Sequence, residues 1–410
     1  MSGRMGLVLS GGAARGAYEA GVVLHLVEEV ARDLGRPLPL DILCGTSVGA
    51  INACLLAAFA DEPVGRGRRL AAHWRGLRMS DVVHPDGRGI WASVRGLFKS
   101  QRSPREQDER RGGILDPKGI EQLVERSVPF RRISENIQAG HLSALTVSAT
   151  HVGSGRKTVF IEQGDGPRYS AGDPTVLGVQ TSMRAEHALA SAAIPFLFPA
   201  VRIDGEFYCD GGLRQNVPLA PALRLGASSL LVVSPRHLTA KPPRAVEQDR
   251  EQDFPGPFFL LGKALSSLLL DRIDNDLVQL ERINKVLRAG INQYGPSFLD
   301  TINRELGVPA QGPRMRPVQT VTISASQDIG VLAAEYVRSP LFAKRLSPVA
   351  GKIVRRIGEL SADADLLSYL LFDGEFAAQL IELGRADARA RHSELCALFA
   401  DVTDEAQVAA

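Results

Sequence analysis

The sequence predicts an α/β fold in which a mainly parallel sheet lies between helices and a helical region follows toward the C-terminus. The first observation is that a strand, a glycine turn and a helix follow one another twice within the first 60 residues. Units of this kind place successive strands side by side and parallel, with their helices on the faces of the sheet. The second observation is the helical pattern that continues from Val331 onward.

The first of these units starts with the short apolar stretch Gly6 to Ser10, which predicts a strand that ends in two glycines. A helix is predicted from Ala17 to Val30, because valines and leucines recur there at helical spacing. The second unit repeats the order with a strand, a turn and an Ala- and Leu-rich helix over residues 40–44, 45–49 and 50–60.

The middle of the chain predicts further strands and helices of the same sheet. Strands are expected at residues 142–150, 157–161, 229–234 and 318–324, and helices at 184–192, 218–225 and 258–288. Residues 201–208 predict a β-hairpin, because Asp204-Gly205 is a two-residue turn between apolar runs.

We therefore expect one domain over residues 1–330 and a helical C-terminal region over residues 331–410. Residues 61–113 form a basic, lid-like excursion from this domain, with twelve Lys or Arg against seven Asp or Glu. Residues 241–257 are rich in proline and charge, which is typical of a linker.

Composition limits the classes of function. The 410 residues carry 48 Lys or Arg against 46 Asp or Glu, a formal net charge of +2. This balance gives no long-range field to hold nucleic acid, so we expect no nucleic-acid partner. Hydrophobic residues make up 44% and charged residues 23%, which excludes wholesale disorder.

The cysteines and the apolar stretches indicate the compartment. Four cysteines are too few for a disulfide framework, and none forms a C-x-x-C pair suited to zinc or redox work. The apolar run Met5 to Leu9 is shorter than the core of a secretory leader, and the longest later stretch, Phe254 to Leu270, is too broken to span a membrane. We expect a cytoplasmic protein.

Residues Gly45 to Gly49 match G-x-S-x-G, the pattern of a nucleophile elbow. In such an elbow a serine, here Ser47, sits on a sharp turn between a strand and a helix, and small neighbours permit the strained backbone. The expected strand before it and the Ala-rich helix after it fit this context. The other interpretation is a helix N-cap, with Ser47 or Thr46 as the capping hydroxyl.

Residues Ser10 to Gly16 form a second candidate element, in which small residues expose backbone N–H groups beside a helix N-terminus. Such an arrangement binds anions. The phosphate-loop pattern fails because Ala17 and Tyr18 follow Gly16, and the dinucleotide pattern fails because Ala13 stands where its middle glycine is required. A transient oxyanion remains as the anion.

Asp210, Gly211 and Gly212 would alone indicate only a turn. They follow the segment Ala190 to Pro199 and the expected hairpin, and this order resembles the third signature block of the patatin-like phospholipases. The loop and the elbow are similar to that family's other two blocks, in the family's order, within residues 5–235.

The resemblance implies a patatin-like three-layer fold and assigns roles to three sets of residues. The oxyanion hole is Gly11, Gly12, Ala13, Ala14, Arg15 and Gly16; the elbow is Ser47 with Gly45 and Gly49; the third block is Asp210 with Gly211 and Gly212. Ala13 departs from the family, whose pattern has a third glycine there. Arg15 is the family's basic loop residue, and it supplies either a local positive potential or a salt bridge that fixes the loop.

The resemblance further implies hydrolysis of lipid carboxylic esters by a Ser-Asp dyad, with Ser47 as nucleophile, Asp210 as base and an acyl-serine intermediate, without a metal ion or organic cofactor. A conventional triad needs a histidine late in the chain, and only His237 and His392 follow Asp210. The alternatives are that triad, acyl transfer to an acceptor other than water, and a non-catalytic lipid- or partner-binding module on the same scaffold.

Residues 88–102 predict a helix that contacts either a membrane or the protein core. Apolar residues including Trp91 and Phe98 recur at helical spacing, with Arg95 and Lys99 among the basic residues nearby. This pattern suits a helix lying on an anionic membrane surface, at the inner face of the membrane for a cytoplasmic protein. The other interpretation is a lid helix whose apolar side packs on the core. The sequence does not predict an oligomeric state.

Overall fold

The structure is a computed structural model. It describes residues 3–78, 118–164, 168–195, 197–215, 217–237, 273–308, 314–343 and 364–408. The expected lid-like excursion is described only as far as residue 78. The expected linker at 241–257 and the amphipathic segment at 88–102, with Trp91, Arg95, Phe98 and Lys99, lie outside the described residues.

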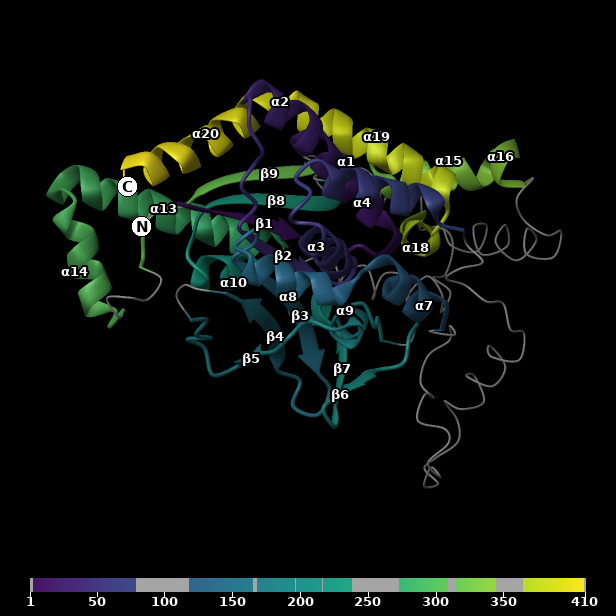
Figure 1. Cartoon of the computed structure of the whole chain (residues 1–410), viewed down its shortest axis with the longest axis horizontal. Coiled ribbons are helices and arrows are strands. Elements are labelled where there is room, and N and C mark those ends of the chain that lie inside the picture. Colours follow the sequence, from purple (N-terminus) through teal and green to yellow (C-terminus); the bar gives the residue numbers. More distant parts are fainter. Residues whose placement is uncertain are drawn as a thin grey trace, which may run out of the picture.

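One sheet of nine strands forms the centre of the described chain (Figure 1). Its main path has the order β5-β4-β3-β2-β1-β8-β9, and the hairpin β6-β7 joins it through β3. The strands are β1 Arg4–Leu9, β2 Ile42–Thr46, β3 Ala144–His151, β4 Lys157–Gln163, β5 Val176–Gln180, β6 Val201–Ile203, β7 Glu206–Asp210, β8 Ala227–His237 and β9 Gln319–Ala325. The path from β3 through β2, β1 and β8 to β9 is parallel, so the predicted mainly parallel sheet is confirmed.

Helices surround the sheet and extend to the end of the described chain. They are α1 Gly16–His25, α2 Ala31–Asp33, α3 Val48–Ala58, α4 Gly65–Gly76, α7 Lys118–Ser127, α8 Phe130–Gln138, α9 Ala185–Ser191, α10 Leu219–Arg224, α13 Ile273–Tyr294, α14 Ser297–Glu305, α15 Ile329–Arg338, α16 Pro340–Ala343, α18 Ala364–Leu370, α19 Gly374–Ala390 and α20 His392–Val408. Short 3-10 turns occur at η1 Ala13–Arg15 and η3 Gly211–Leu213, and η2 Leu26–Val30 is a π-helical turn. Within the described ranges, no helix combines the length and apolar character needed to cross a membrane.

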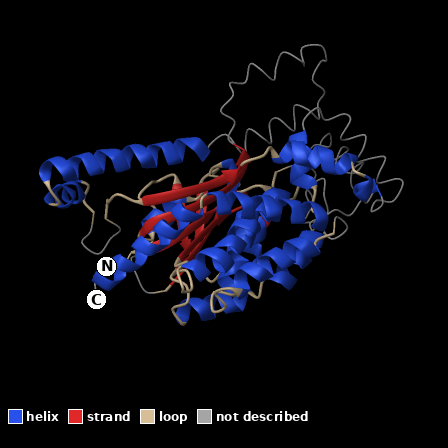
Figure 2. Ribbon diagram, turned by 90° about the horizontal axis from the view of Figure 1, so that it is seen from above, coloured by secondary structure: helices blue, strands red, loops and turns tan. Residues whose placement is uncertain are grey.

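Side chains that point alternately to the two faces of the sheet explain why helices cover both faces. In β1, Leu7 and Leu9 belong to a hydrophobic cluster shared with α1, α3 and α19, whereas Val8 belongs to a second cluster shared with α10 and α13. Successive side chains of a strand point to opposite faces, so an entirely apolar strand buries both of its faces under helices. Figure 2 shows the sheet between the long helix α13 on one side and the larger group of helices on the other. The predicted α/β class with its helical C-terminal region is confirmed.

Helix α19, in the C-terminal region, packs along α1 and shares its core (Figure 1). The two backbones approach so closely that a Cβ added at Gly21 would lie 2.0 Å from the carbonyl oxygen of Ile381, and one added at Gly384 would lie 2.1 Å from that of Tyr18. Outside this seam, Arg385 and Arg389 both pair with Glu29, just after α1. Residues near the two ends of the chain therefore build one hydrophobic core.

Several local predictions meet the structure directly. The hairpin turn is confirmed, with φ 49° at Asp204 and 92° at Gly205, and the predicted late strand joins the same sheet as β9, parallel to β8. The first predicted helix is found as α1, η2 and α2 in succession. Strand β5 was not predicted, because it has only five residues, is partly exposed and contains Gly178.

Candidate active site

The elbow around Ser47 has the strained geometry that the sequence pattern requires. Ser47 lies between β2 and α3, with φ 55° and ψ −129°, a conformation that residues other than glycine rarely adopt. A Cβ at Gly45 would lie 2.3 Å from the carbonyl oxygen of Gly49, and one at Gly49 would lie 2.5 Å from that of Leu9. Both glycines are therefore needed for the elbow to fold against β1.

Asp210 lies beside the elbow because its strand, β7, pairs with the last residues of β3. It is the last residue of β7 and pairs with Ala149 of β3 in antiparallel register. Its backbone is fixed on both sides, since its N–H donates to the carbonyl of Ala193 at 2.9 Å and its carbonyl accepts from the Thr150 hydroxyl at 2.9 Å. The following Gly211 is pressed against β3, where a Cβ would lie 2.2 Å from the carbonyl oxygen of Ser148.

The side chains of Ser47 and Asp210 are in direct contact. The Ser47 hydroxyl donates to Oδ2 of Asp210 at 2.7 Å, and the backbone N–H of Gly212 donates to Oδ1 at 2.7 Å. Ser47 is 2% exposed and Asp210 is fully buried. Burial raises the pKa of Asp210 from 3.8 to about 7, although the two hydrogen bonds act in the opposite direction. A serine hydroxyl thus faces a carboxylate whose basicity suits neutral pH.

Ser191, at the end of α9, also contacts the elbow, and the sequence did not reveal this role. Its hydroxyl accepts the backbone N–H of Ser47 at 2.8 Å and donates to the carbonyl of Ser148 at 2.6 Å. Ser191 is fully buried. The residue stands within the segment that precedes the third signature block, but 144 residues separate it from Ser47. It links β3 to the strained backbone of the elbow.

The glycine-rich loop that follows β1 contains three backbone N–H groups that could bind an anion. The N–H groups of Gly12, Ala13 and Ala14 form no hydrogen bond within the described chain, although all three residues are buried. Ala13 has φ 47°, in the left-handed region, and the helical conformation of Arg15 follows. Alternation of left- and right-handed residues turns successive N–H groups toward one point, as in anion-binding nests. These donors can hold an oxyanion.

Asn52 of α3 fixes the start of α1 against the elbow helix. Its side-chain amide donates to the carbonyl of Gly16 at 3.1 Å and to the Glu19 carboxylate at 2.8 Å, and its oxygen accepts from the Trp74 indole at 3.0 Å. All of these groups are buried, and burial raises the pKa of Glu19 well above its ordinary value. The network holds the loop and the elbow in a fixed relation, and no local sequence pattern marks it.

Arg15 is buried and turns toward the C-terminal region. Its Nε donates to the hydroxyl of Ser368 at 2.8 Å, and its guanidinium lies 4.2 Å from the centre of the Tyr369 ring. These contacts tie the loop to α18 through a hydrogen bond and a cation–π interaction. Of the two expected roles, fixation of the loop is the one that these contacts serve, with a hydroxyl and an aromatic ring as the partners.

The two late histidines lie in other hydrogen-bond networks. His237 donates from Nδ1 to the carbonyl of Ala325 at 2.9 Å, and His392 contacts His25 at 3.1 Å. Within the described ranges, no histidine forms a hydrogen bond with Ser47 or Asp210. Among the same residues, no group of His, Cys, Asp and Glu is arranged to hold a metal ion.

The three signature elements therefore meet in one place, and a comparison with known proteins fits this arrangement. The family model described as patatin-like phospholipase matches residues 7–223, more than half of the chain. The chain belongs to this family. In this patatin-like protein the match covers β1 to α10, and so includes the loop, the elbow and the block around Asp210.

Two curated relatives carry phospholipase names. Lysophospholipase NTE1 of Mycosarcoma maydis is 26% identical over 247 residues, which cover 59% of this patatin-like chain and 10% of that protein. The cGAMP-activated phospholipase of Pseudomonas aeruginosa is 29% identical over 225 residues, covering 52% of this chain and 53% of that protein. The chain thus spans about a tenth of the first relative and about half of the second.

Among solved structures, the chain was matched to that of VipD from Legionella pneumophila. It is 15% identical, with a TM-score of 0.34, and the alignment covers 93% of this chain and 67% of VipD.

Proposed function

We propose that this patatin-like protein is a serine-dependent lipid acyl hydrolase, of phospholipase A, lysophospholipase or esterase type. Ser47 is the nucleophile, Asp210 is the base, and the reaction passes through an acyl-Ser47 intermediate. The observation that carries the proposal is the 2.7 Å hydrogen bond from the Ser47 hydroxyl to the buried Asp210 carboxylate. The names of the two relatives support a lipid ester as substrate.

In the first step, Asp210 accepts the proton of Ser47 through Oδ2 as the serine oxygen attacks the ester carbonyl. A base works best when its pKa lies near the operating pH, and the pKa of about 7 meets this requirement. The Gly212 N–H holds the other carboxylate oxygen, so the base keeps its orientation during the transfer. The strained elbow presents the serine oxygen at the start of α3.

In the transition state, the negative charge on the former carbonyl oxygen is stabilised by the N–H groups of Gly12, Ala13 and Ala14. Donors of this kind contribute on the order of 3 kcal/mol each in other acyl-transfer enzymes. Protonated Asp210 then gives its proton to the leaving alcohol, and the acyl group stays on Ser47. Water attacks the acyl-serine and Asp210 takes a proton from it. As the acyl bond breaks, Asp210 returns this proton to the Ser47 oxygen and the free acid leaves. Neither step uses a cofactor.

Contact with the lipid surface is a further part of the proposal. Residues 88–102 carry the apolar Trp91 and Phe98 next to the basic Arg95 and Lys99. In this proposal the protein works from the cytoplasm at the inner face of the membrane. Replacing Trp91 and Phe98 by Ala should weaken sedimentation with anionic vesicles and leave hydrolysis of a soluble short-chain ester unchanged; equal sedimentation of both proteins contradicts this part alone.

The test of the catalytic proposal is the variant Ser47→Ala. It should lose labelling by a serine-directed fluorophosphonate and lose hydrolysis of a panel of phospholipids, lysophospholipids, glycerides and short-chain esters. Ser228→Ala is the matched control, since this buried serine donates only to the carbonyl of Arg4. Wild-type turnover in folded Ser47→Ala would remove the serine from the mechanism. Mass spectrometry of products formed with an added alcohol separates hydrolysis from acyl transfer.

A further inference from the structure

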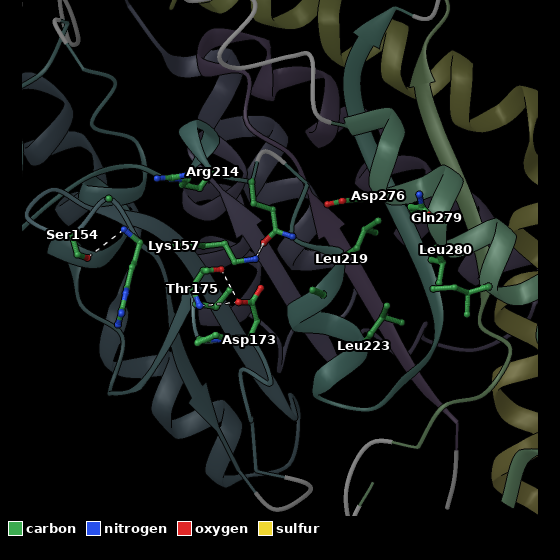
Figure 3. A pocket seen from close by; sticks show the side chains of 17 residues that line it. Ser154, Lys157, Asp173, Thr175, Arg214, Leu219, Leu223, Asp276, Gln279 and Leu280 are labelled. Carbon is green, nitrogen blue, oxygen red and sulfur yellow. Dashed lines mark hydrogen bonds between the residues drawn. The ribbon is translucent and has the colours of Figure 1, made fainter. Parts of the chain in front are cut away.

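A cavity of about 800 Å³ lies away from the dyad. Its walls come from the β3-β4 connection, the segment before β5, the residues that follow η3, and helices α10 and α13 (Figure 3). Neither Ser47 nor Asp210 lines it. Its volume falls within the range of roughly 300–1,000 Å³ that is typical of small-molecule sites.

One end of the cavity is cationic. Arg156, Lys157 and Arg214 line it, and no ion pair or hydrogen bond of the described chain involves the guanidinium of Arg156 or Arg214. The Lys157 ammonium donates to Oε1 of the buried Gln215 at 2.7 Å, and this bond fixes its position. Burial lowers the pKa of Lys157, so a bound anion would relieve an existing electrostatic cost. Two unpaired guanidinium groups beside a held ammonium suit a phosphate.

The other end of the cavity is aliphatic. Leu219 and Leu223 of α10 face Leu280 of α13, and Ile283 of α13 is 42% exposed despite its apolar side chain. Figure 3 shows Arg214 and Ser154 on one side and these leucines on the other, with the carboxylates of Asp173 and Asp276 between them. None of the described residues that line the cavity is aromatic.

We infer that this cavity binds a single-chain phosphate amphiphile of the lysophosphatidic acid type. The phosphate would lie against Arg156, Lys157 and Arg214, and the acyl chain against the aliphatic wall. A free hydroxyl on the glycerol between them would donate to the carboxylates of Asp173 and Asp276. Nucleotides share the order of phosphate, hydroxyl group and apolar group, but the lining offers no ring on which a base could stack.

The cavity is connected to the dyad through one turn. The Asp210 carboxylate accepts from the N–H of Gly212, and the N–H groups of Arg214 and Gln215 both donate to the carbonyl of Gly211. Gln215 in turn holds Lys157. An anion that draws Arg214 and Lys157 together therefore acts on the turn that orients Asp210. Binding of the amphiphile in the cavity does not depend on the proposed hydrolysis. An effect of the bound amphiphile on turnover does rest on the proposed hydrolysis.

The test is calorimetric titration of Ser47→Ala protein with 1-octanoyl lysophosphatidic acid kept below its micellar concentration. We expect saturable binding at one site. Replacing both Arg156 and Arg214 by Ala should weaken it at least about tenfold, because hydrogen bonds to charged groups contribute roughly 1.5–3 kcal/mol each. Ile283→Asp should weaken it through the acyl chain. Arg131→Ala, at an arginine that is 92% exposed on α8, is the matched control and should bind as the parent does.

Three further ligands show which parts of the amphiphile the cavity recognises. Monooctanoylglycerol lacks the phosphate, inorganic phosphate lacks the chain, and AMP replaces the chain by a base; all three should bind more weakly than the amphiphile. Absence of saturable binding, binding that survives the double arginine variant, or AMP binding as tightly as the amphiphile would each overturn the inference. Because the titration needs no turnover, its failure is distinguishable from a failure of the proposed hydrolysis.

Discussion

The backbone N–H of Ser47 donates to the hydroxyl of Ser191 at 2.8 Å, in a fully buried position. The same hydroxyl donates onward to the carbonyl of Ser148, so one side chain satisfies a backbone N–H of the elbow and a backbone carbonyl of β3. A strained turn keeps its conformation only when surrounding contacts determine it. Ser191 is therefore a positioning residue for the elbow and does not itself touch the reacting atoms.

Ser191→Ala should lower both stability and turnover. The change leaves a buried donor and a buried acceptor unpaired, which costs about 1–3 kcal/mol per group. We expect a lower midpoint of chemical denaturation and a fall in kcat with little change in KM. The control Ser228→Ala should leave kcat intact. A normal kcat in Ser191→Ala, at full folding, would show that the elbow keeps its geometry without this link.

The role proposed for Asp210 as the base predicts that activity falls at acidic pH. The base must be ionised, so kcat/KM should fall as the pH drops through about 7, in line with the raised pKa of this carboxyl. Asp210→Asn should reduce turnover by about 10²–10⁴-fold, the usual contribution of a general base. The matched control is Asp204→Asn in the exposed hairpin turn. A rate that stays constant down to pH 5 would contradict the assignment.

The same carboxyl should make stability depend on pH. Its folded pKa of about 7 lies above the ordinary 3.8, so between these values the folded protein holds a proton that the unfolded chain has lost. Stability from this group is present below pH 3.8 and is lost as the pH rises through about 7. The asparagine of Asp210→Asn cannot ionise. The melting temperature of this variant should therefore exceed that of the wild type by a larger margin at pH 8 than at pH 5.

The late histidines provide the test between the dyad and a conventional triad. His237 and His392 each bond to groups other than Ser47 and Asp210, so His237→Ala and His392→Ala should retain most of the turnover. Kinetic assays of both variants, with circular dichroism as the check on folding, decide the matter. If His237→Ala were as inactive as Ser47→Ala while folded, a triad would replace the dyad.

Ala13 and Ala14 form a pair in which glycine should have opposite effects. Ala13 has φ 47°, where a Cβ costs roughly 1–2 kcal/mol, whereas Ala14 lies in the turn η1 without a positive φ. Ala13→Gly should therefore stabilise the protein by about 1 kcal/mol and keep its activity, and Ala14→Gly should destabilise it. Denaturant titration of the two variants measures the difference. Destabilisation by both would contradict the strain at Ala13.

The seam between α1 and α19 should not tolerate a methyl group. In Gly21→Ala the new Cβ would lie 2.0 Å from the Ile381 carbonyl oxygen, so the helices must separate, at a cost of about 1–3 kcal/mol. Gly76→Ala at the end of α4 meets nothing within 4 Å and is the control. We expect a lower denaturation midpoint only for Gly21→Ala. Equal midpoints would mean that the two helices are not tightly packed.

Sequence patterns were sufficient where structure is local. The strand and turn around Ser10, the elbow at Ser47 and the hairpin at Asp204 were all placed by residue spacing and turn chemistry, and the structure has them there. The short strand β5 was not predicted, because its five residues lack a clear alternation of apolar and polar side chains. The prediction that Ser47 and Asp210 work together came from the family resemblance, since 163 residues separate them.

Contacts between distant segments were not predictable. Nothing near Ser191 indicates that it accepts a hydrogen bond from Ser47, and the seam of α1 with α19 depends on two glycines, Gly21 and Gly384, that look ordinary in the sequence. The cavity beside Arg156 likewise arises from the loop at Arg156 and helix α13, which meet only in the folded chain. Such features depend on tertiary packing and leave no periodic signal.

The contact of Arg15 with Ser368 joins residues that are 353 positions apart. A ribosome adding about 5–20 residues per second needs on the order of 20–70 s to pass from one to the other. During that interval the elbow at Ser47 has been made, but the loop beside it has no anchor in α18. Synthesis order thus delays completion of the loop, and we expect chains still on the ribosome to lack the proposed hydrolase activity.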